Sequence, residues 1–240
     1  RYFINLTQPE IAAQLKKNPL VILPAGSVEQ HGPHLPTGTD IYAANVISHA
    51  VAERMDGLVL PGGPLGVTPM HMPFEGTITL SPETYQRVVV ETGASTAQHG
   101  AKRLMILNWH EGNIPSLAIA SEKLHRDVGM SVIVVQACYV AAELYGHDCG
   151  GLTHGGEIEA LAVLAYINLE RKGIPMFKNL TGGLKSHTTK IGLLALAGVI
   201  GHTLTTVSSG GPVDWKEVGL GAVVAVLGAL AKDNAEPAKP

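Results

Sequence analysis

Cysteine, aromatic residues and runs of like charge are all scarce in this chain of 240 residues. Its two cysteines, Cys138 and Cys149, are too few for a disulfide framework. The net charge is −3 and there is no basic run, so nothing electrostatic points to a nucleic acid or an anionic membrane as a partner. We therefore expect no disulfide-stapled fold, no nucleic-acid partner and no membrane partner.

Long apolar segments and targeting signals are lacking too. The most apolar late stretch, residues 218–231, is shorter than the ~20 residues that a membrane-spanning helix needs. Residues 1–5 do not have the charged and then apolar pattern of a signal peptide. A Gly-x-Ser-x-Gly segment, which places a serine nucleophile on a strand-to-helix turn, is also absent. These absences make the cytoplasm the expected location and argue against an activated serine.

The residues that are present describe a compact globular chain with many tight loops. Hydrophobic residues make up 45% of the chain and charged residues 15%, which is unlike a disordered protein. The 28 glycines and 15 prolines suit an α/β enzyme with many turns. A chain of this length can bury the core of one domain, so we predict a single domain over 1–240, with 233–240 as a flexible tail.

Short apolar strands alternate with helical patterns along the chain. Strands are predicted at 20–25, 58–60, 104–107 and 131–136, and helices at 9–17, 44–55, 82–99, 115–125, 155–169 and 215–232. Residues 139–153 read as loop. Strands that alternate with helices imply a parallel sheet covered on both faces. The predicted fold is therefore a doubly wound α/β/α sandwich with a mostly parallel sheet.

One segment, residues 29–40, carries several groups that can bind a metal. It follows the first predicted strand, and in open α/β sheets ligands collect at the carboxyl ends of the strands. Glu29 and His31 are two residues apart, so on an extended segment their side chains share one face. Asp40 precedes the next helix and returns to the same region. Two carboxylates and an imidazole in one corner suit a divalent cation of borderline hardness.

Four motifs, in this order along the chain, resemble segments of the creatininase family, the creatinine amidohydrolase-like metal hydrolases. They are Glu-Gln-His-Gly-Pro-His-Leu-Pro-Thr-Gly-Thr-Asp at 29–40, His-Met-Pro-Phe-Glu-Gly-Thr-Ile at 71–78, Asn-Trp-His-Glu-Gly-Asn at 108–113 and His-Gly-Gly-x-x-Glu at 154–159. Four motifs together are far more specific than any one of them. The resemblance implies a creatininase-like fold and a site with two divalent metal ions, either zinc, manganese or iron. Glu29 and His110 would bind one ion, His31 and Glu159 the other, and Asp40 would bridge them.

The fifth ligand has an alternative. Creatininase has a Glu two residues after the His that corresponds to His110, where this chain has Gly112. Glu111 is one residue early, and adjacent residues in an extended turn point to opposite sides. We favour Glu159, which matches the later family segment and comes from a separate element, and keep Glu111 as the alternative.

The resemblance also implies roles in the reaction. His154 would carry the proton to the leaving nitrogen, and an imidazole with a pKa near neutrality suits a proton carrier. Trp109, where relatives commonly have Gly, could narrow the pocket, and His71 and Glu75 are further candidates for substrate contact.

Several functions are compatible with this resemblance. The main expectation is an amidohydrolase that cleaves a C–N bond of a cyclic amide or formamide, a small-molecule substrate, through a metal-bound hydroxide. The alternatives on the same site are cleavage of a peptide and ring opening of a cyclic ketone. A relative without turnover that serves binding or assembly is the rival, motivated by the positions of Glu111 and Trp109. Family resemblance further implies a homohexamer.

Overall fold

The computed structural model of the protein describes residues 1–63, 65–145 and 154–171. The chain divides into two compact units, 1–138 and 139–240. The expected single domain stays a prediction. The expected closing helix at 215–232 and tail at 233–240 lie outside the described residues.

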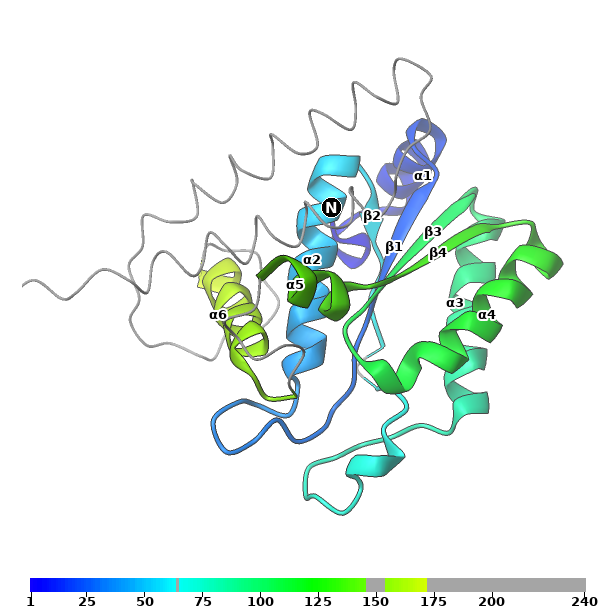
Figure 1. The fold of residues 1–240 in the computed structure, drawn as a ribbon. Helices are drawn as coiled ribbons and strands as arrows, with labels where there is room; N and C mark the ends of the chain where they lie inside the picture. Colours follow the sequence, from blue (N-terminus) through cyan, green and yellow to red (C-terminus); the bar gives the residue numbers. More distant parts are fainter. Residues whose placement is uncertain (64, 146–153, 172–240) are drawn as a thin grey trace, which may run out of the picture. The chain divides into compact units, whose positions relative to one another are not determined.

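A parallel sheet forms the middle of the first unit, and its strands follow the order β2-β1-β3-β4 in the described part of the chain (Figure 1). The strands are β1 (Leu20–Ala25), β2 (Leu58–Val59), β3 (Arg103–Asn108) and β4 (Ser131–Gln136). β1 pairs with β3 along its whole length, from Leu20 opposite Arg103 to Ala25 opposite Asn108. The predicted α/β fold with a parallel sheet is confirmed, and β1 and β4 have the predicted bounds.

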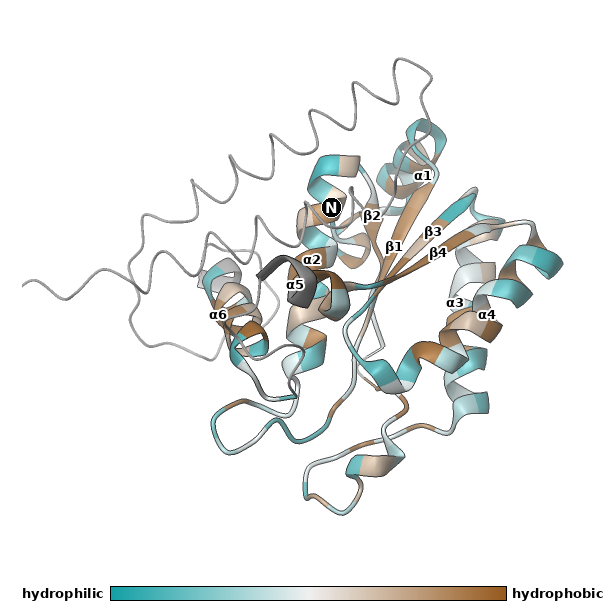
Figure 2. Ribbon diagram, viewed as in Figure 1, coloured by the Kyte–Doolittle hydropathy of each residue, from teal (hydrophilic) through white to brown (hydrophobic). Residues whose placement is uncertain are grey.

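Helices cover both faces of this sheet. α2 (Thr39–Met55) lies on one face, and α3 (Pro82–Gln98) and α4 (Ile114–Val128) lie on the other (Figure 1). The strands are rich in Val, Ile and Leu and are hydrophobic along most of their length, as is typical of parallel strands buried on both faces (Figure 2). The core beneath α3 and α4 includes Ile106 and Leu117, both fully buried. Burial of each such side chain stabilises the fold by ~1.5–3 kcal/mol.

Local signals set where the helices begin. The other helical segments of the first unit are η1 (Phe3–Asn5), α1 (Gln8–Lys17), η2 (Pro69–His71) and η3 (Glu111–Asn113). α1 starts at a capping box, in which the backbone N–H of Thr7 donates to the Glu10 carboxylate at 2.7 Å. At α3 the hydroxyl of Ser81 accepts a hydrogen bond from the backbone N–H of Thr84 at 3.2 Å. The start predicted for α3 is confirmed.

Two helices lie at and beyond the boundary of the units. α5 (Ala137–Tyr145) occupies part of 139–153, which was predicted to be loop, and that prediction is wrong for its first residues. The segment Ala-Cys-Tyr-Val-Ala-Ala-Glu-Leu-Tyr contains several strong helix formers. Their preference for the helical conformation is enough to form α5 before the glycine-containing part of 139–153 begins. α6 (Glu157–Arg171) begins two residues later than predicted, because Gly155 has a positive φ of 72°. No helix in the described residues is long and apolar enough to cross a membrane.

A close backbone approach links β1 to α2. A Cβ atom on Gly26, the residue after β1, would lie 2.7 Å from the carbonyl carbon of Asp40 and 2.9 Å from its carbonyl oxygen. Only glycine permits this approach without a shift of the backbone. The contact brings the first turn of α2, and therefore Asp40, to the carboxyl end of β1.

Candidate metal centre

Three buried side chains from separate elements meet at the carboxyl ends of β1 and β3. Glu29 lies in the loop after β1, Asp40 in the first turn of α2, and His110 directly before η3. Each offers one ligand atom, and these atoms all lie within 4.8 Å of one another. None of the three side chains is more than 7% exposed. The sequence-predicted grouping of Glu29, Asp40 and His110 is therefore present in the first unit.

The protonation of His110 follows from its partners. Its Nε2 lies 3.0 Å from the carbonyl oxygen of Val67. A carbonyl oxygen only accepts, so Nε2 carries a proton and donates it. Its Nδ1 lies 3.3 Å from Oε2 of Glu29 and 3.1 Å from Oδ2 of Asp40. The bond to Val67 thus holds the imidazole and directs Nδ1 at the two carboxylates, in the way that a hydrogen bond on the other ring nitrogen orients metal-binding histidines.

His31 is held in the same way from the other side of Asp40. Its Nδ1 donates to the carbonyl oxygen of Glu29 at 3.1 Å, and its Nε2 lies 3.0 Å from Oδ1 of Asp40. The two oxygens of Asp40 therefore face different imidazoles, those of His31 and His110. A carboxylate that bridges two ions needs one oxygen toward each, and this arrangement is compatible with that role. The bridging role of Asp40 stays a prediction.

Ser27 belongs to this centre, although sequence reasoning did not identify it. Its hydroxyl lies 2.8 Å from Oε2 of Glu29 and 2.9 Å from Oδ2 of Asp40, and the side chain is fully buried. The hydroxyl has one proton, so Ser27 donates to Glu29 or to Asp40 at any one time. By donating to each in turn it keeps the two carboxylate oxygens near each other. Its place directly after Gly26 at the end of β1 was the available signal.

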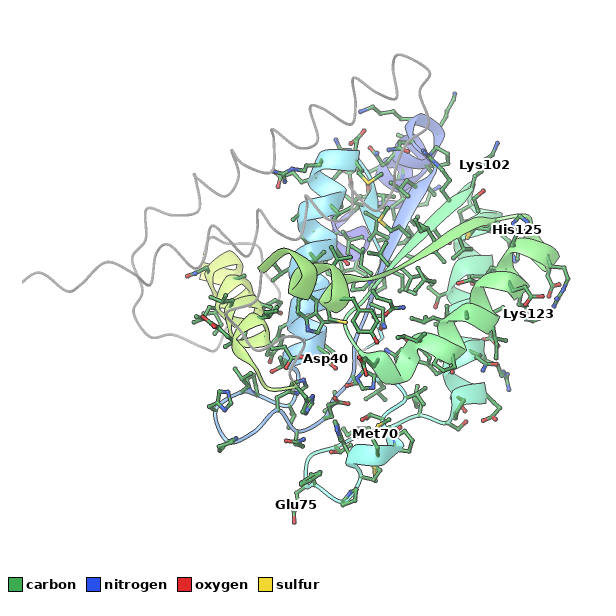
Figure 3. The ribbon with its side chains drawn as sticks, in the orientation of Figure 1. Asp40, Met70, Glu75, Lys102, Lys123 and His125 are labelled. Carbon is green, nitrogen blue, oxygen red and sulfur yellow. The ribbon has the colours of Figure 1, made fainter. Side chains whose placement is uncertain are left out.

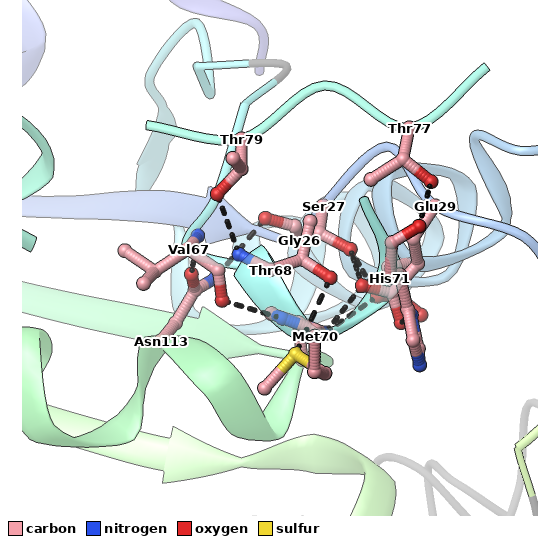
Figure 4. A network of polar contacts seen from close by, with 12 residues as sticks. Gly26, Ser27, Glu29, Val67, Thr68, Met70, His71, Thr77, Thr79 and Asn113 are labelled. Atoms are coloured by element: carbon pink, nitrogen blue, oxygen red, sulfur yellow. Dashed lines mark hydrogen bonds and ion pairs between the residues drawn. The ribbon is translucent and has the colours of Figure 1, made fainter. Parts of the chain in front are cut away.

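A buried amide network lies beside the centre, and Figure 4 shows the part formed by Asn113. The Asn113 side chain accepts from the backbone N–H of Val67 at 2.9 Å and donates to the carbonyl oxygen of Gly26 at 3.0 Å. The Asn108 side chain donates to the carbonyl oxygen of His110 at 2.6 Å. These bonds join the ends of β1 and β3 to the segment that carries Val67, and so fix the acceptor that orients His110.

The electrostatics of the centre favour a positive charge beside Glu29 and Asp40. Burial alone would raise the pKa of Glu29, but hydrogen bonds and the charge of His110 lower it to about 2. Burial alone would lower the pKa of His110, yet its hydrogen bonds to Asp40 and Glu29 and their charges raise it to about 10. The pKa of Asp40 is lowered by His110 and His31 against the effect of its burial. The ionised carboxylates thus hold a proton on His110 and fit a divalent cation in the same place.

We expect uptake of a metal ion to release a proton from His110, because Nδ1 must be deprotonated to act as a ligand. With a pKa of about 10 for His110, metal affinity should rise roughly tenfold per pH unit between pH 7 and 9. Calorimetric titration with Zn²⁺ in buffers of different ionisation enthalpy measures the proton count. An affinity independent of pH over this range contradicts the role of His110.

The same shifts set the pH range in which the metal-free protein is most stable. The raised pKa of His110 contributes stability that is fully present below 6.5 and is lost as the pH rises toward 10. The lowered pKa of Glu29 contributes stability that is present above 4.5 and is lost as the pH falls toward 2. Thermal melts in the presence of chelator should therefore show the highest melting temperature between about pH 4.5 and 6.5.

The remaining sequence-predicted residues of the first unit lie in different surroundings. His71 contacts Glu29, with 3.1 Å between its Nδ1 and Oε1 of Glu29. Trp109 is buried at 2% exposure. Glu75 is exposed at the outer tip of its loop, away from Asp40 (Figure 3), and Glu111 is exposed at the start of η3. Substrate contact by His71, Glu75 and Trp109 stays a prediction.

The second unit carries the other two predicted site residues. His154 precedes α6 and is exposed, and Glu159 lies in the first turn of that helix. The backbone N–H of Gly155 donates to Oε2 of Glu159 at 2.6 Å, a bond that satisfies an otherwise unpaired group at the helix start. The catalytic role of His154 and the choice of Glu159 over Glu111 as the fifth ligand stay predictions.

Comparison with curated proteins identifies several relatives. The chain is 37% identical over 164 residues to a mycofactocin precursor peptide peptidase of Mycobacterium ulcerans (strain Agy99). The aligned residues cover 63% of this chain and 60% of the relative. The chain is 36% identical over 120 residues to the corresponding protein of Mycolicibacterium smegmatis, 46% of this chain and 48% of the relative. It is 29% identical over 181 residues to creatinine amidohydrolase of Pseudomonas putida, 67% of this chain and 70% of the relative. The chain thus spans about half to three fifths of the length of the peptidases it matches.

Comparisons with solved structures and with protein families point to the same family as these relatives. A structure described as creatininase with Mn has a TM-score of 0.60 and 24% identity, and 96% of each chain is covered. A creatininase variant described as Zn–Zn type has a TM-score of 0.60 and 21% identity, again with 96% of each chain covered. Both similarities concern the fold. Residues 4–169 match the family described as creatininase, creatinine amidohydrolase. The chain belongs to the creatininase family.

Proposed function

We propose that this chain is a metal-dependent hydrolase that cleaves a peptide bond. The observation that carries the proposal is the buried cluster of Glu29, Asp40 and His110, whose ligand atoms all lie within 4.8 Å of one another. The matches with mycofactocin precursor peptide peptidases support a peptide over the cyclic amide or formamide that we expected from the sequence. Ring opening of a ketone has weaker support, from 29% identity over 135 residues to 3-dehydro-scyllo-inosose hydrolase of Thermotoga maritima.

Two divalent ions, zinc, manganese or iron, form part of the proposal. The donor set of carboxylate oxygens and an imidazole nitrogen suits each of these metals. Glu29 and His110 would hold one ion, His31 and Glu159 the other, and Asp40 would bridge them. When bound, such ions supply an acidified water and polarise a carbonyl group.

The residues of the chain would transfer the proton and hold the metal-binding groups. Peptide hydrolysis adds water across the C–N bond, so the water oxygen ends in the new carboxylate and a proton must reach the leaving amine. His154 is the proposed carrier of that proton, because an imidazole exchanges protons near neutral pH. Ser27 and the carbonyl oxygen of Val67 would hold the metal-binding groups in place throughout.

The test compares substrates on metal-loaded protein. Protein reconstituted with Mn²⁺ or Zn²⁺ is incubated with a mixture of short synthetic peptides, with creatinine and with an N-formyl amine. New amines measure cleavage of the peptides and the N-formyl amine, and creatine measures hydrolysis of creatinine. We expect peptide cleavage by the wild type and by Glu122→Gln, a change at an exposed position on α4, and none by Asp40→Ala. Faster hydrolysis of creatinine than of any peptide contradicts the proposal.

Creatinine hydrolysis is the second candidate, favoured by the match that covers 70% of creatinine amidohydrolase of Pseudomonas putida. A protein that binds metal and hydrolyses neither class of compound would favour a binding or assembly role instead. For assembly we propose a homohexamer, in line with family resemblance. Light scattering that gives a particle of 25.2 kDa, the mass of one chain, contradicts it.

A further inference from the structure

One contact of the centre has no part in the function proposed above. Nδ1 of His71 lies 3.1 Å from Oε1 of Glu29, and the His71 side chain is only 20% exposed. The other oxygen of Glu29, Oε2, faces the hydroxyl of Ser27 and Nδ1 of His110. The two oxygens of this carboxylate therefore have different partners, Oε2 within the metal cluster and Oε1 toward His71.

The backbone of His71 is held by its own turn and not by the cluster (Figure 4). The backbone N–H of His71 donates to the carbonyl oxygen of Thr68 at 3.2 Å. Its carbonyl oxygen accepts from the backbone N–H of Phe74 and from the hydroxyl of Thr77, each at 2.9 Å. The Phe74 ring meets the imidazole edge to face, with ring centroids 6.3 Å apart. Three of these contacts fix the backbone of His71 and the fourth touches its ring, so the imidazole is presented to Glu29 from an ordered turn.

The turn is itself attached to the segment that orients His110. The backbone N–H of Thr68 donates to the hydroxyl of Thr79 at 2.8 Å, and the neighbouring Val67 provides the acceptor for His110. Residues 67–71 therefore contact both Glu29 and His110, which the proposed function assigns to the same ion. A shift of this segment would move both groups together.

We propose that His71 is a positioning residue that holds Oε1 of Glu29 and thereby directs Oε2 at the metal. The inference rests on the proposed function, since it concerns the same centre. A carboxylate that is held by a partner at one oxygen has lost rotational freedom before the metal binds. Metal binding therefore does not have to fix the orientation of the carboxylate, and the affinity is higher. His71 acts here through Glu29, and this role is distinct from the substrate contact expected from the sequence.

The test uses two variants of similar size that differ in where they place an N–H group. The side-chain amide of His71→Asn can donate from near the position of Nδ1, whereas that of His71→Gln reaches the position of Nε2. Affinity for Zn²⁺ is measured by competition with a chromophoric chelator, which does not depend on turnover. We expect His71→Gln to bind Zn²⁺ ~10–100-fold more weakly than wild type, and His71→Asn to stay within ~3-fold.

The outcomes separate this inference from the proposed function. Equal affinities for the two variants, whether both weakened or both unchanged, overturn the role of His71. Asp40→Ala is measured in parallel, and retention of Zn²⁺ by that variant at wild-type affinity overturns the metal centre itself. Melting temperatures of the metal-free variants show whether any loss of affinity comes from unfolding.

Discussion

Asp40→Ala is expected to abolish binding of both proposed metal ions and to abolish turnover. Oδ1 of Asp40 faces Nε2 of His31 and Oδ2 faces Nδ1 of His110, so one substitution removes the group shared by both sides of the centre. Loss of an outer partner of a metal ligand typically costs ~10–100-fold in affinity, and loss of a shared ligand should exceed that range. The metal-free variant should lose ~1–3 kcal/mol of stability as well, because two buried imidazoles lose an acceptor.

Elemental analysis of protein purified without chelator gives the metal content directly. Asp127→Ala is the matched control, since this carboxylate is exposed on α4 and pairs with Lys123. We expect the control to keep the metal content of the wild type. One ion retained at wild-type affinity in Asp40→Ala would show that Asp40 serves a single ion and does not bridge.

Gly112→Ala is expected to be the most destabilising single-methyl change at this site. A Cβ atom on Gly112 would lie 2.1 Å from the carbonyl oxygen of Val67 and 2.5 Å from Nε2 of His110. It would therefore push apart the two atoms whose hydrogen bond orients His110. Overpacking costs ~1–3 kcal/mol and occasionally more, and a lost buried hydrogen bond adds ~1 kcal/mol.

Gly63→Ala is the matched control for this change, because nothing lies within 4 Å of a Cβ placed there. Thermal melts compare the melting temperatures of the two variants, and Zn²⁺ titrations compare their metal affinities. We expect Gly112→Ala to lower the melting temperature and the metal affinity together, and Gly63→Ala to change neither. Equal behaviour of the two variants would mean that the segment around Val67 relaxes without loss.

Gly112, two residues after His110, has no room for a side chain. A Cβ there would displace the bond that His110 donates to Val67, so this position supplies no ligand. Glu159 remains the predicted residue, with Glu111 as the alternative.

Local pattern was enough to predict much of the first unit. β1 and β4 have the predicted bounds because runs of Val, Ile and Leu between turn residues specify buried strands within a few positions. Glu29 and Asp40 were identified in the same way, since strand ends and helix starts are local features. α5 was missed because residues 139–153 were read as one loop, although helix formers occupy its first part.

Such local patterns do not predict contacts between residues that are far apart in the chain. The tautomer of His110 depends on Val67, which is 43 positions away in the chain. The contact of His71 with Glu29 depends on the turn from Thr68 to Thr77. Ser27 is conspicuous only once Glu29 and Asp40 are seen on either side of its hydroxyl. Each of these roles follows from tertiary packing, which spacing along one sequence does not encode.

The pairing of β1 with β3 gives a bound metal an effect on the whole first unit. Glu29 follows β1 and His110 follows β3, so an ion shared by them would clamp two strands that are neighbours in the sheet but not in the chain. By mass action, an ion at 100 times its dissociation constant adds ~2.7 kcal/mol to the free energy of unfolding. Because the clamp joins central strands, chelation should lower the unfolding temperature of this unit as one cooperative transition.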